Sequence, residues 1–69
     1  MEGYIVKDED GRIYFFRSKP YKRGNYWVSV YIADYEEIYA DDLSSNIKPQ
    51  WSDDEPIKVK LQFVKNNIQ

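Results

Sequence analysis

The fold is decided by the stretch Gly3-Tyr-Ile-Val-Lys-Asp-Glu-Asp-Gly-Arg-Ile-Tyr-Phe-Phe16. Its centre, Asp10-Gly11, lies between two runs of β-favouring residues and is a strong hairpin signal, because a type I′ turn requires positive φ at both central residues. A two-residue loop places Ile5 opposite Phe16. The stretch therefore predicts two antiparallel strands, residues 3–8 and 12–17.

The chain on the C-terminal side of the hairpin contains a further strand pattern. The segment 12–17 is apolar on both faces, which is typical of a central strand or of a curled sheet. Residues 18–25 contain Pro20 and Gly24 and predict a loop. Residues 26–33 predict a third strand, with one apolar face and one mixed face. The apolar face consists of Tyr26, Val28, Val30 and Ile32, and the other of Trp27, Ser29 and Tyr31.

Residues 34–45 fit two interpretations. Asp34 and Glu37 are spaced as a helix N-cap and its third residue, whereas residues 37–40 also fit a short strand. We favour the strand, followed by a helical turn near 42–45. Residues 47–56 predict a loop, and strict alternation over 57–64 predicts a half-buried strand.

Together these elements predict a mainly β protein. We expect a single antiparallel sheet of about five strands, strongly curved or closed as a small barrel, with at most one short helical turn. Residues 1–65 form one domain, and residues 66–69 fray. Lys58 and Lys60 are suited to protect the last strand from edge pairing. The first strand has only Lys7 for this purpose, so we expect a monomer or a weak homodimer paired through that strand.

The composition argues against catalysis. The chain has no His and no Cys, the residue types that most often carry proton transfer, nucleophilic attack and metal ligation, but it has seven Tyr, three Phe and two Trp. The acidic middle segment, residues 34–55, lacks the spacing of a calcium-binding loop. A one-layer core also leaves little room for a cleft. We expect no enzymatic activity, no cofactor and no metal site.

An excess of aromatic residues favours a protein-interaction module, since Tyr is enriched at interfaces. The expected binding residues are Tyr21, Arg23, Tyr26, Trp27 and Tyr31. In this interpretation Trp27 is exposed, and its replacement by alanine leaves the fold nearly intact while abolishing association.

The alternative is single-stranded nucleic-acid binding through residues 17–27. This segment combines aromatic residues with four cations, Arg17, Lys19, Lys22 and Arg23. The net charge of −2 argues against it, because nucleic-acid-binding domains are usually basic. A solvated basic loop is the simplest explanation of the same residues.

The C-terminal stretch Trp51-Ser-Asp-Asp-Glu-Pro-Ile-Lys-Val-Lys-Leu61 has two further implications. Trp51 is either a cover over the core or an exposed anchor, and base rates favour the cover. With the opening Gly3-Tyr-Ile-Val and the Asp10-Gly11 turn, the stretch resembles short uncharacterised open reading frames of phages and mobile elements in gut bacteria. The resemblance implies an accessory or host-interaction role and carries over no catalytic residue.

The N-terminal residues lack the basic and long apolar segments of a signal peptide, and the longest uncharged run, residues 24–33, is too short to cross a bilayer. We therefore expect a cytoplasmic protein without membrane contact.

Overall fold

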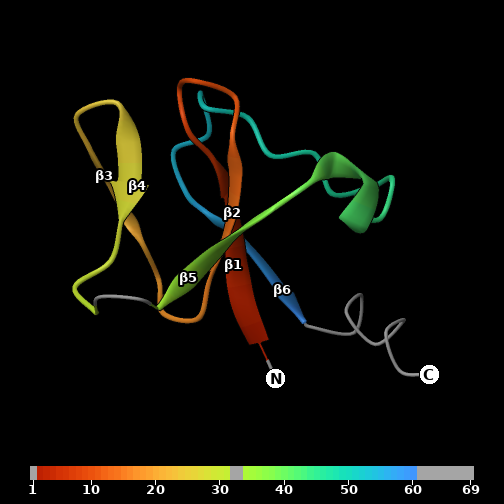
Figure 1. Cartoon of the computed structure of the whole chain (residues 1–69), viewed down its shortest axis with the longest axis horizontal. Coiled ribbons are helices and arrows are strands. Elements are labelled where there is room, and N and C mark those ends of the chain that lie inside the picture. The colour runs from red at the N-terminus through yellow and green to blue at the C-terminus, as the bar shows by residue number, and fades with distance from the viewer. Residues whose placement is uncertain (1, 32–33, 61–69) are drawn as a thin grey trace.

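The structure is a computed structural model that describes residues 2–31 and 34–60. In this part of the chain its elements are β1 (Glu2–Lys7), β2 (Ile13–Phe16), β3 (Tyr21–Arg23), β4 (Tyr26–Val28), β5 (Tyr35–Ile38), the 3-10 turn η1 (Ala40–Asp42) and β6 (Ile57–Lys60). The strands form two antiparallel sheets, one ordered β5-β2-β1-β6 and the other consisting of β3 and β4. Figure 1 shows the β3–β4 hairpin beside the larger sheet. The mainly β prediction is confirmed, but the single curled or barrel-like sheet is wrong.

The β1–β2 turn differs by one residue from the predicted turn. The Asp8 N–H donates to the Arg12 carbonyl at 2.9 Å, and the Gly11 N–H donates to the Asp8 carbonyl at 2.9 Å. The loop therefore has three residues, and Ile5 pairs with Phe15 rather than Phe16. A loop of this kind needs positive φ at one position, and Gly11 supplies it with φ 94°.

Both faces of the larger sheet carry a cluster of buried apolar residues. One face carries a cluster of buried apolar residues and is covered by Leu43 and Ile47 from the loop that precedes β6; the cluster consists of Ile5, Ile13, Phe15, Ile38 and Val59. The other face carries Val6 and Phe16 and is covered by Trp27 of the small hairpin, with half-buried Trp51 against the same cluster. The central position predicted for the Ile13–Phe16 segment is confirmed. Trp51 covers the core, as expected, although there is no barrel for it to close.

The predicted loop 18–25 and strand 26–33 are wrong in part. Gly24, with φ 65°, and Asn25 form a tight turn that joins β3 to β4. The predicted faces are inverted, because Trp27 is only 5% exposed whereas Tyr26 is 53% exposed. The expectation that Trp27 is an exposed aromatic is therefore wrong. The strand ends at Val28, and residues 32–33 of the predicted strand lie outside the described residues.

The second half of the chain follows the strand interpretation. The strand β5 lies at residues 35–38 rather than at the predicted 37–40, which excludes the helical alternative there, and the helical turn lies at residues 40–42 rather than 42–45. The loop 47–56 is confirmed, and β6 shows the expected alternation up to Lys60. The predicted residues 61–64 and the expected fraying at 66–69 lie outside the described residues.

The order of the strands decides which of them lie at an edge. β6 is an edge strand and presents Lys58 and Lys60 to solvent, as expected. β1 lies between β2 and β6, so its proposed edge-to-edge pairing is wrong. Within residues 2–31 and 34–60, no helix is long and apolar enough to span a membrane.

Candidate functional site

An aromatic groove of about 850 Å³ lies between the two sheets. The larger sheet contributes residues of β2, β5 and the β1–β2 turn, and the small hairpin contributes β4 and the residues after it. Ten residues line the groove: Asp8, Asp10, Tyr14, Phe16, Tyr26, Trp27, Val28, Ser29, Tyr31 and Tyr35. The expectation that the protein has little room for a cleft is wrong, because the space arises between two sheets rather than inside one.

The walls of this aromatic groove are held in place by contacts between rings. Tyr35 stacks on Phe16 with ring centroids 5.1 Å apart, and it meets the edge of Tyr14 at 5.6 Å. Phe16 is almost fully buried, so it is a fixed support for the half-exposed Tyr35. Rings that are already ordered lose less conformational entropy when a ligand binds.

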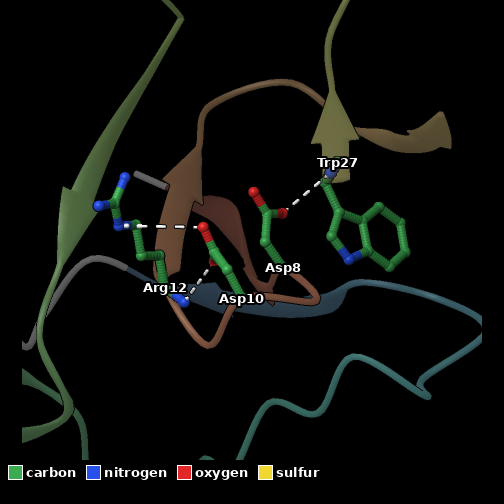
Figure 2. Close-up of polar contacts among 4 residues, drawn as sticks. All are labelled: Asp8, Asp10, Arg12 and Trp27. Carbon is green, nitrogen blue, oxygen red and sulfur yellow. Dashed lines mark hydrogen bonds and ion pairs between the residues drawn. The ribbon is translucent and has the colours of Figure 1, made fainter. Parts of the chain in front are cut away.

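Asp8 lines the groove and links the two sheets. Its Oδ1 accepts the Trp27 N–H at 2.9 Å, as Figure 2 shows. The residue is only 8% exposed. Burial raises the pKa of the Asp8 carboxyl above its ordinary value of 3.8, the Trp27 hydrogen bond opposes this, and the nearby Asp10 adds to it. The negative charge of the Asp8 carboxylate therefore lowers the stability of the folded protein, because burial removes water from it.

Asp10 has a different environment, because it is tied to Arg12. Its carboxylate accepts the Arg12 backbone N–H at 2.9 Å and lies 3.9 Å from the Arg12 Nε, as drawn in Figure 2. The Tyr14 hydroxyl and then Asp10 raise the pKa of the Arg12 guanidinium, so Arg12 remains charged. Arg12 partly compensates the charge of Asp10, whereas no ion pair to Asp8 occurs among the described residues.

The structure brings together some of the residues expected to bind. Tyr26 and Tyr31 line the aromatic groove and are well exposed, and Trp27 forms part of its buried wall. Tyr21 lies instead in a smaller pocket with Pro56, and Arg23 is exposed on β3 outside the groove.

The basic loop does not form a uniform patch of cations. The Lys19 Nζ lies 3.0 Å from a Glu55 carboxylate oxygen. The Lys22 Nζ lies 4.4 Å from the Trp51 ring centroid and 5.4 Å from that of Trp27, a cation–π arrangement that covers the core. Arg17 and Arg23 are exposed. Two of the four proposed phosphate contacts therefore already have partners within the protein.

Sequence reasoning missed seven of the ten residues that line the groove, including Asp8, Tyr14 and Tyr35. In the sequence, Asp8 is the last residue of the predicted strand 3–8, and Tyr35 belongs to a segment that fits two interpretations. The available signal was the two-faced pattern of β2, which requires a cover on each side of the sheet. It did not reveal that a hairpin formed by residues 21–28 supplies one of these covers.

Replacing Asp8 with asparagine is expected to stabilise the fold at neutral pH. The raised pKa of Asp8 means that folding favours the uncharged carboxyl. The stabilisation of the folded state by protonation of Asp8 is fully present below about pH 3.8, and it is lost as the pH rises through the pKa of the folded protein. Asparagine is uncharged at every pH and can still accept the Trp27 N–H.

Urea denaturation of Asp8→Asn and the natural protein, at neutral pH and at about pH 3, measures this difference. The variant should be more stable at neutral pH, and the two proteins should converge in acid. A variant that is less stable at neutral pH would contradict the proposed cost of the charge.

Among the described residues, no group of three or more His, Cys, Asp or Glu side chains is placed to hold a metal ion. No family model, curated protein or solved structure matches the chain.

Proposed function

We propose that this protein is a non-enzymatic interaction module that binds a segment of a protein partner in the aromatic groove between its two sheets. The observation that carries the proposal is the groove itself, about 850 Å³ in volume and lined by six aromatic side chains. Pockets of this size, mostly apolar with a few polar groups, are typical binding sites.

The exposed tyrosines are the groups suited to contact a partner. Tyr31 is 62% exposed, and Tyr26 and Tyr35 are about half-exposed on the opposite walls. Tyrosine combines a large apolar ring with a hydroxyl and has few rotatable bonds, so it contributes contact area at a low cost in entropy. A peptide lying in the groove would bury these rings from both sides.

The alternative, nucleic-acid binding through residues 17–27, has less support. Lys19 and Lys22 are engaged by Glu55 and Trp51, and the groove contains Asp8 and Asp10, which would repel phosphates. The protein partner is therefore the function that the geometry supports best.

Selection from a displayed library of random short peptides tests the proposal. We expect Tyr31→Ser to weaken the selected ligands by about tenfold, because truncation of a central aromatic at an interface typically costs 1–2 kcal/mol or more. The matched control is Tyr39→Ser, since Tyr39 is 65% exposed but does not line the groove.

Three outcomes would contradict the proposal. The first is a library that yields no ligand, and the second is a set of ligands that Tyr39→Ser weakens as much as Tyr31→Ser. The third is a salt-sensitive complex with a mixed single-stranded oligonucleotide whose NMR shifts map to residues 17–27, which would favour the nucleic-acid alternative.

A further inference from the structure

One end of the aromatic groove is acidic. Asp8 and Asp10 line the groove, and a shallow extension of about 340 Å³ shares both of them and Tyr26 while adding Glu9 and Asn25. No Lys or Arg is found among the described residues that line either space. This end of the groove therefore carries negative charge beside aromatic rings.

Asp8 is the buried acidic residue at this end of the groove. The residue is 8% exposed, and one of its carboxylate oxygens accepts the Trp27 N–H. The second oxygen has no hydrogen-bond partner among the described residues, and Figure 2 shows it turned away from Trp27. This oxygen is not among the fully buried polar atoms that lack a partner, so it keeps access to solvent and is available to pair with a bound cation.

The surroundings of Asp8 favour an organic cation. Rings attract a cation over their faces, with contributions of about 0.5–2 kcal/mol each, and Tyr26, Tyr31 and Tyr35 line the same groove as the carboxylate. Small inorganic cations instead require several oxygen ligands at once. An alkylammonium group satisfies the carboxylate with its charge and the rings with its methylene or methyl groups.

The raised pKa of Asp8 agrees with this arrangement. The folded protein holds a charge that it would be more stable without, and perturbed groups of this kind occur preferentially at functional sites. Arg12 lies beside Asp10, whereas no ion pair to Asp8 is found in the part of the chain that the structure describes, so the uncompensated charge is the one on Asp8.

We propose that the acidic end of the aromatic groove binds the alkylammonium group of a lysine side chain in a basic segment of the partner protein, with its charge against Asp8 and its carbons against the surrounding rings. The proposal rests on the function proposed above and adds the chemistry of the group that enters the groove. Recognition of an alkylammonium by rings and a carboxylate also explains why a binding groove would retain a buried acid.

An NMR titration of the full chain with capped lysine derivatives tests this proposal. The probes are capped lysine, capped trimethyllysine and a neutral analogue in which a tert-butyl group replaces the trimethylammonium group. We expect millimolar binding of a charged probe with shifts confined to groove residues, and at least about fivefold weaker binding of the neutral analogue. The stronger of the two charged probes identifies the methylation state.

Two variants with the same change in net charge provide the control. Asp8→Asn should weaken the charged probe by at least about fivefold while remaining folded, because asparagine keeps the acceptor for the Trp27 N–H. Asp41→Asn, on the exposed turn η1 outside the groove, should leave binding unchanged. Equal effects of the two variants, or equal binding of the charged and neutral probes, would overturn the proposal.

The outcomes also separate this inference from the proposed function. One outcome is a set of selected peptides that contain no basic residue, lose affinity with Tyr31→Ser and bind Asp8→Asn as well as the natural protein. This outcome would support the binding groove and overturn the lysine site. Shifts of the same residues by calcium ions alone, without a response to charged probes, would assign the acid end to a metal. Absence of any groove ligand in both experiments would overturn both proposals.

Discussion

Replacing Gly3 with alanine is expected to unfold most of the protein. A Cβ at this position would overlap the ring of Phe15 and would lie 2.8 Å from the backbone oxygen of Phe16. Rotation of a ring relieves only the first of these overlaps, because a backbone oxygen in the centre of the sheet cannot move without breaking the β1–β2 pairing. We expect a loss of about 3 kcal/mol or more, which is comparable to the whole stability of a domain of this size.

Gly11 provides the matched control for the Gly3 variant. It lies in the β1–β2 turn with positive φ, and apart from its chain neighbours no atom of the described residues is within 4 Å of the site where a Cβ would be. Gly11→Ala therefore tests backbone strain alone and should cost about 1 kcal/mol. Urea denaturation followed by far-UV circular dichroism measures both variants. Equal costs for Gly3→Ala and Gly11→Ala would show that the close approach at Gly3 is absent.

The contact between Gly3 and Phe15 can be tested by a second pair of variants. Phe15→Leu removes the ring atoms nearest to the added Cβ, so Gly3→Ala should cost less in that background than in the natural chain. Additive effects would assign the whole loss to the backbone contact with Phe16.

Replacing Trp27 with alanine is expected to cost about 3–5 kcal/mol, the usual range for a large buried aromatic. Trp27 is buried against Val6 and Phe16 and is the side chain through which β4 covers the larger sheet. Its loss would release the β3–β4 hairpin and open one face of the core. This expectation replaces the sequence-based one, in which Trp27 is exposed and its truncation harmless.

Trp27→Phe separates the role of the ring from that of the indole nitrogen. The Trp27 Nε1 is buried and has no hydrogen-bond partner within residues 2–31 and 34–60, and an unpaired buried donor costs about 1–3 kcal/mol. Phenylalanine keeps much of the apolar area and removes this donor, so its net cost should remain below about 1.5 kcal/mol.

Urea denaturation combined with hydrogen exchange at the amides of β3 and β4 distinguishes release of the hairpin from global unfolding. A Trp27→Ala variant with the midpoint of the natural protein would contradict the structural role of this residue. If Trp27→Phe lowers the free energy of unfolding as much as Trp27→Ala does, the indole nitrogen has a hydrogen-bond partner in solution.

The aromatic groove could be predicted from the sequence only in fragments. Tyr26 and Tyr31 were recognised as binding candidates because exposed tyrosines near a loop are typical of interfaces. Asp8 was not, since nothing local distinguishes a turn carboxylate in solvent from one that is buried under a second sheet. Tyr35 was missed for a related reason: its strand forms by pairing with β2, a distant contact that local preference does not specify.

The sequence by itself determined the β class, the β1–β2 hairpin, the two-sided burial of Ile13–Phe16 and the alternation that begins at Ile57. These features follow from side-chain period and turn chemistry, which act over a few residues. Only the tertiary structure decided the loop length at Gly11, the second sheet and the inward orientation of Trp27. Each of these depends on which segment covers an apolar face, and that is settled by packing between residues far apart in the chain.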